Sequence, residues 1–152
     1  MRDPVLSTTE RAFLADARRA MLVTMAPDGR PRPVPICFVL DAGRPVLYLP
    51  LDEKPKTVDD PLRLARVRDL LAEPHVSILV DRWDEDWSRL AWLRIHGRAA
   101  LLLPEDGPAE HAAAVASLRA KYPQYATHDL DMRPIIRIAL ERATSWGPLE
   151  SP

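Results

Sequence analysis

The stretch LVTMAPDGRPRPVPICFVL, residues 22–40, decides the fold class. The turn signal PDGR (27–30) separates the strand-like run AMLVTMA (20–26) from the segment PRPVPICFVL (31–40). Apolar residues in that second segment alternate with the others, as in a strand with one buried face: Val34, Ile36, Phe38 and Leu40. The stretch therefore predicts a β-hairpin.

The second strand of this hairpin contains Pro31, Pro33 and Pro35. Proline has no backbone N–H and cannot donate to a strand ladder. We therefore expect this strand to lie at a sheet edge, or to border a ligand or a second subunit.

Four further segments extend the sheet. After the turn DAGR, a strand at 45–51 should complete an antiparallel meander of three strands. Strands are also expected at 75–83, 90–103 and 134–146. The 90–103 strand is two-faced, since one side carries Trp92, Arg94, His96 and Arg98.

Three helices are expected between the strands. Ser7 and Glu10 form a capping-box pattern for a helix reaching about Arg19. Asp60 as N-cap and Pro61 as first residue predict a second helix, and residues 105–121 predict a third. In the second helix three residues should share one buried face: Leu64, Val67 and Leu71.

Six mostly antiparallel strands with peripheral helices favour a closed or nearly closed small barrel, because closure removes exposed sheet edges. An open α+β sheet is the alternative. The length of 152 residues fits one domain, residues 1–152.

The composition is that of a globular protein, with 47% hydrophobic residues, 28% charged residues and a net charge of -1. It implies no nucleic-acid partner. One cysteine excludes an internal disulfide and a CxxC pair, which fits a reducing cytoplasm. No segment has the apolar length of a signal peptide or of a membrane span, so no membrane partner is expected.

Several of these motifs together resemble the split-barrel flavoproteins related to pyridoxamine phosphate oxidase, whose fold is the FMN-binding split barrel. The similar stretches are LVTMAPDGRPRPVPICFVL, VLYLPLDEKPK, VRDLLAEPHVSILV and WLRIHGRA, with a last strand that ends in Trp146. KPK and DRWDEDWSRLAW resemble most the branch of coenzyme F420 (deazaflavin) dependent enzymes. Asp69 departs from the family, where asparagine is typical.

The lysines gain a role from this resemblance. Only three are present, and Lys54 and Lys56 share the loop DEKPK. The resemblance implies that they hold the cofactor phosphate, for which a compact ammonium is suited. Arg66 is favoured over Arg68 as an additional phosphate ligand. A merely solvated turn is the alternative for the lysines.

The resemblance also implies where the cofactor ring lies. It places the ring along the second strand and the end of the third, at Val34, Pro35, Ile36, Cys37 and Leu51. In the family the cofactor lies between two protomers, so contacts from Trp87, Trp92 and Arg94 would come from the neighbouring chain of a homodimer. Core packing or a plain dimer contact explains the tryptophans about as well.

The remaining reactive side chains suggest no catalytic group. Cys37 has no histidine beside it in any motif, and we interpret it as an inert buried cysteine. We interpret His96 as a solvated or interface residue rather than a proton donor. The other histidines lack metal-ligand spacing, so no metal is predicted.

The expected function is that of an oxidoreductase in which reduced coenzyme F420 passes a hydride to a small electron-poor organic substrate. An FMN-dependent oxidase or reductase on the same fold is the alternative within the enzymes. A protein that binds or carries deazaflavin without turnover is the alternative outside them.

Overall fold

The computed structural model describes residues 4–51 and 64–150. Lys54 and Lys56 therefore lie outside the described residues. The helices are α1 (Thr8–Asp16), α2 (Ala65–Ala72) and α3 (Pro108–Lys121), with the short 3-10 helices η2 (Trp87–Arg89) and η3 (Pro123–Thr127). The strands are β1 (Ala20–Met25), β2 (Pro31–Ile36), β3 (Val39–Leu40), β4 (Val46–Leu49), β5 (His75–Arg82), β6 (Ala91–Leu102) and β7 (Ile135–Trp146).

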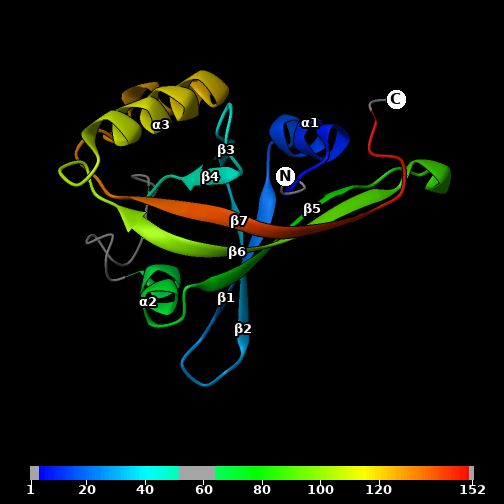
Figure 1. Ribbon diagram of the computed structural model, residues 1–152, viewed down its shortest axis with the longest axis horizontal. Coiled ribbons are helices and arrows are strands. Elements are labelled where there is room, and N and C mark those ends of the chain that lie inside the picture. The colour runs from blue at the N-terminus through cyan, green and yellow to red at the C-terminus, as the bar shows by residue number, and fades with distance from the viewer. Residues whose placement is uncertain (1–3, 52–63, 151–152) are drawn as a thin grey trace.

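The strands form one antiparallel sheet in the order β2-β1-β5-β6-β7-β4-β3. The sheet curls around a core that takes side chains from strands, α1 and α2. Figure 1 shows α3 and α2 on opposite sides of the long strands β6 and β7. The expected antiparallel barrel with peripheral helices is confirmed.

The second predicted strand is two strands in the structure, so the sheet has seven strands instead of six. Ladder pairing with β1 ends at Ile36, and pairing with β4 begins at Val39. Both predicted antiparallel pairings are present, β1 with β2 and β3 with β4, but the middle strand of the meander is broken and its two parts lie at opposite edges of the sheet. The continuous segment from Pro31 to Leu40 instead contributes to both edges and brings them together.

Tyr122 stabilises the break between β2 and β3. Its hydroxyl accepts a hydrogen bond from the Phe38 N–H at 3.2 Å. The Phe38 and Arg18 carbonyls lie 3.1 and 2.9 Å from the same hydroxyl and compete for its proton. A buried side chain thus satisfies backbone groups of Phe38 where no ladder partner is present.

The helix α2 differs from its prediction. It begins at Ala65, with Leu64 as its N-cap. The predicted start at Asp60 and Pro61 lies outside the described residues. Leu70 is buried and Leu71 is 58% exposed, so the predicted face is wrong by one residue. Asp69 lies on the buried side, where its Oδ2 accepts from the Thr24 hydroxyl at 2.9 Å and pairs with Arg32 Nε at 2.8 Å. Those two contacts give the carboxylate at this position its partners in β1 and β2.

The helix α3 covers β3 and β4 through a second and a third apolar cluster. Glu110 on this helix accepts from the Tyr48 hydroxyl at 2.6 Å and from Arg137 Nε at 2.9 Å. Burial first, and the bond to Glu110 second, raise the pKa of Tyr48 to about 12. None of the described helices is long and apolar enough to cross a membrane.

Candidate functional site

Predicted site residues of β2 and β6 lie on the same outer face of the sheet, in one row across four strands. Register places Pro35 opposite Met21, Met21 opposite Leu79, and Leu79 opposite Arg94. Met21 and Leu79 are 37% and 42% exposed, so this row is an apolar surface that the chain itself does not cover. Three strand spacings, about 14 Å, separate Pro35 from Arg94.

That separation decides which predicted residues can act together. Pro35 and Arg94 share a face, but they are too far apart to contact one end of a ring within a single chain. The spacing is compatible with contributions from two protomers facing each other.

Among the predicted site residues in strand β2, only Pro35 has an exposed side chain. Val34 packs against the core, and Ile36 is 9% exposed. Leu51 is fully buried, so only its backbone could contact a cofactor. As an edge strand with three prolines, β2 offers mainly carbonyl acceptors along its free edge. Such an edge suits the ring N–H of a flavin or deazaflavin pyrimidine.

Cys37 lies in the break between β2 and β3. It is half-buried and packs against the third apolar cluster, beneath α3 and η3. This packing agrees with an inert cysteine.

Arg94 offers a cation on the outer face. Its Cζ lies 5.3 Å from the centroid of the Trp92 ring. Among the described residues, no carboxylate or carbonyl contacts its guanidinium. An arginine held over an aromatic ring and left without an anionic partner suits an anionic group of a ligand.

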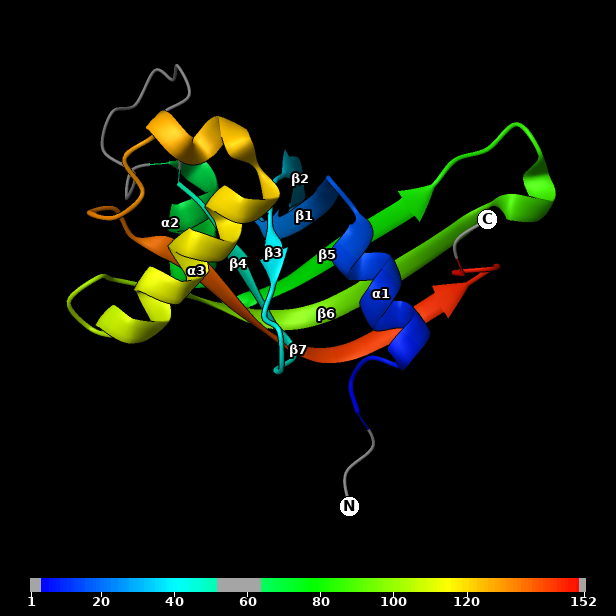
Figure 2. The same ribbon diagram turned by 90° about the horizontal axis from the view of Figure 1, so that it is seen from above.

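The tryptophans of the β5–β6 connection lie at one end of the molecule. Trp83 and Trp87 are 64% and 70% exposed, so core packing does not explain them. Figure 2 shows this connection, with η2, extending away from α2 and α3. The arm could reach a neighbouring molecule. On α2, Arg66 is half-buried and Arg68 is exposed.

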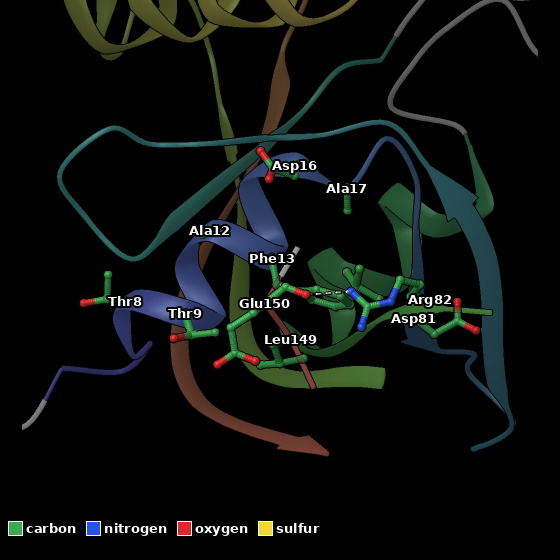
Figure 3. A pocket seen from close by; sticks show the side chains of 11 residues that line it. Thr8, Thr9, Ala12, Phe13, Asp16, Ala17, Asp81, Arg82, Leu149 and Glu150 are labelled. Atoms are coloured by element: carbon green, nitrogen blue, oxygen red, sulfur yellow. Dashed lines mark hydrogen bonds between the residues drawn. The ribbon is translucent and has the colours of Figure 1, made fainter. Parts of the chain in front are cut away.

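Sequence reasoning missed a cavity of about 480 Å³ between α1, the end of β5 and the C-terminal segment (Figure 3). Phe13 lines it, with the carboxylates of Asp16, Asp81 and Glu150. Arg82 Nε donates to the Arg89 carbonyl at 2.9 Å, and its other nitrogens bond carbonyls of the C-terminal segment. Because Arg82 already donates to backbone carbonyls and three carboxylates line the cavity, the cavity does not suit a negatively charged phosphate. No sequence pattern links its scattered residues.

Within the described residues, no group of three histidine, cysteine or acidic side chains could hold a metal ion.

The curled antiparallel sheet, with its proline-rich edge strand, defines a split-barrel fold. The family model described as pyridoxamine 5'-phosphate oxidase matches residues 6–147. The chain belongs to this family. No curated protein sequence matches the chain.

Three similar solved structures show the breadth of this fold. A conserved hypothetical protein of Mycobacterium tuberculosis has 22% identity and a TM-score of 0.72, covering 97% of this chain and 88% of its own. An F420 reductase has 20% identity and a TM-score of 0.61, and the match covers 88% of this chain and 94% of the reductase chain. A heme storage protein of Vibrio cholerae has 15% identity and a TM-score of 0.66, and the match covers 97% of this chain and 95% of the storage protein's chain. At these identities the likeness concerns the fold alone.

Proposed function

We propose that the protein is an oxidoreductase that uses reduced coenzyme F420 to reduce a small electron-poor organic substrate, as a homodimer with the cofactor at the subunit interface. The observation that carries the proposal is Arg94 stacked on Trp92, with no anionic partner in the described part of the chain, beside the exposed apolar row of Met21 and Leu79. A planar cofactor with anionic substituents complements such a surface.

The residues of this chain divide the work of binding. The β2 edge accepts the ring N–H, and Arg94 and Trp92 of the partner subunit's sheet face contact the cofactor from the other side. Lys54, Lys56 and Arg66 hold the phosphate. When bound, the deazaflavin supplies the hydride, while the apolar row excludes water.

The resemblance of KPK and DRWDEDWSRLAW to the F420 branch, and the F420 reductase among the similar folds, support the choice of cofactor. FMN is the alternative cofactor. Binding without turnover is the alternative function, and the heme storage protein shows that this fold also serves storage.

A spectroscopic titration tests the proposal. Purified protein is titrated separately with oxidised coenzyme F420, FMN and hemin, and the dissociation constants are compared. We expect F420 to bind most tightly. Tighter binding of FMN would favour the alternative cofactor, and tighter binding of hemin would refute the proposed function. Turnover is then measured as oxidation of reduced F420 in the presence of an electron-poor alkene.

The variant Lys56→Ala tests whether this lysine binds the cofactor phosphate. Loss of a charge-assisted hydrogen bond should cost roughly 1.5 to 3 kcal/mol, or about tenfold to a hundredfold in F420 affinity. Lys56→Arg, which keeps the charge, should retain part of the affinity. The exposed Arg19 is a suitable control position, and Arg19→Ala should bind like the parent at the same ionic strength. Equal affinity of Lys56→Ala and Arg19→Ala would show that the loop is only solvated.

A further inference from the structure

A serine and a histidine face each other on the outer surface of the sheet. Ser77 and His96 are register partners on β5 and β6. The Ser77 hydroxyl oxygen lies 3.0 Å from His96 Nδ1, and the imidazole is half-buried. This contact fixes the orientation of the ring and leaves Nε2 without a partner among the described residues.

A β-bulge adds a carboxylate beside this pair. His96 pairs with Arg142 on β7, and the next residue, Gly97, pairs with Leu140, so Glu141 is the extra residue. Bulges redirect side chains in this way. Glu141, Ser77 and His96 all line one cavity of about 310 Å³. The bulge thus assembles acid, hydroxyl and imidazole groups in a space that can admit a small molecule.

Several charged groups surround the imidazole. His75 on β5 and Glu141 on β7 line the same cavity. Arg142 is the register partner of His96, and Arg94 and Arg98 flank it along β6. The groups around the imidazole therefore carry both signs of charge. Imidazole is the side chain that exchanges protons near neutral pH, so this arrangement suits a proton donor.

We propose that His96 Nε2 donates the proton that accompanies hydride transfer to the substrate, and that Ser77 positions the ring for it. This inference rests on the proposed function, and it revises the interpretation of His96 as a solvated or interface residue. His96 lies two residues from Arg94 on the same face of β6, where the cofactor is proposed to bind.

The chemistry balances for an alkene conjugated to a carbonyl group. The hydride from reduced F420 brings two electrons to the β-carbon, and the proton from Nε2 goes to the α-carbon. The C=C π bond breaks, two C–H bonds form, and the neutral imidazole regains its proton from water.

The first test does not depend on turnover. Diethyl pyrocarbonate acylates accessible imidazoles, and mass spectrometry locates the modified residues. We expect His96 to react in the free protein and to be protected by oxidised F420. His128, which follows η3 and does not line this cavity, serves as internal reference and should not change its reactivity. Equal modification of His96 with and without bound cofactor would overturn the placement of His96 at the site.

The second test follows the oxidation of reduced F420 by 2-cyclohexenone as a function of pH. His96→Gln should lower kcat about a hundredfold and leave the dissociation constant of F420 unchanged. The decline of kcat with rising pH, caused by loss of the donated proton, should disappear in His96→Gln. Ser77→Ala should retain that decline but shift its midpoint.

His75→Gln is the matched control, because His75 lines the same cavity but bonds Glu73 through Nδ1 at 2.6 Å. It should retain the parent's pH profile. An unchanged profile in His96→Gln would overturn the role of His96 and leave the proposed function intact. Failure of the parent to bind F420, or to oxidise its reduced form with this alkene, would overturn both.

Discussion

The environment of the Lys121 side chain differs from the one that its sequence pattern predicts. Its position on the alanine-rich helix suggests a solvated lysine. In the structure the Nζ is buried without a hydrogen-bond partner among the described residues, 3.9 Å from the centroid of the Phe38 ring. Desolvation first, and the charge of Arg18 second, lower the pKa of Lys121 to about 8.

Lys121→Met should stabilise the protein at neutral pH. Because the folded-state pKa is below the unfolded value of 10.5, the fold carries the full penalty of the charge below pH 8. The side chain is partly solvated and contacts Phe38, so we expect a gain of only about 1 to 2 kcal/mol. Urea denaturation at pH 7 checks this gain.

The same substitution should change how stability depends on pH. Between pH 8 and 10.5 the unfolded state binds more protons at Lys121, so this residue makes parental stability rise with pH. Tyr48 acts in the opposite direction, but only between about pH 10 and 12. Urea denaturation measured between pH 7.5 and 9.5 therefore reports the contribution of Lys121 to the pH dependence of stability, without that of Tyr48. Parallel curves for parent and Lys121→Met would contradict its burial as a cation.

At the scale of elements, Tyr122→Phe tests the hydroxyl that supports the break between β2 and β3. Removing it leaves the buried backbone groups of Phe38 without a partner, at a cost of about 1 to 3 kcal/mol. The aromatic ring and its packing stay in place. Urea denaturation measures the loss, and stability equal to the parent's would mean that the hydroxyl is not needed there.

The bulge opposite Gly97 gives a second prediction for an element. A Cβ at this position would lie 2.7 Å from the Ala139 carbonyl oxygen and 2.8 Å from Ile138 Cγ2. Gly97→Ala should therefore force β6 and β7 apart and destabilise the protein by about 1 to 3 kcal/mol. Gly43→Ala is the control, because nothing lies within 4 Å of its added Cβ. Equal thermal midpoints for the two variants would contradict the close approach.

The hairpin, the barrel class, the capping box and the two-faced β6 could be predicted because each depends on local patterns. The break after Ile36 could not. Phe38 remains fully buried, so the alternation of apolar residues continues through the break. A period of two reports which side of a strand faces the core, not which strand lies beside it. The same limit hides Glu141, whose position depends on a register shift with β6.

For the candidate site, the family resemblance suggested Arg94 and Trp92, and alternation along the strand correctly predicted that both lie on one face of β6. It chose Ile36 and Leu51 without knowing that their side chains are buried. It gave His96 no chemical role, because its contact with Ser77 depends on the pairing of two strands. Local periodicity does not determine which distant segments of the chain pair with each other.

At the scale of the whole molecule, the exposed apolar row predicts self-association. Leu79→Asp places a charge in the middle of that row, and we expect it to convert a homodimer into a monomer and to weaken F420 binding. Light scattering at micromolar concentration measures the mass. Met132→Asp is the matched control, because Met132 is 78% exposed and lies outside the sheet. A monomeric parent, or a dimeric Leu79→Asp, would contradict the proposed interface.

The single segment that supplies both edges of the sheet also constrains the order in which the protein folds. The hairpins β1–β2 and β3–β4 join near neighbours in the chain and can form early. Completing the sheet requires Val46 to meet Ala139, more than half the chain away. Because β2 and β3 are covalently continuous, that late pairing also fixes the circumference of the barrel. Slow, cooperative folding limited by the closure of β4 on β7 follows from this connectivity.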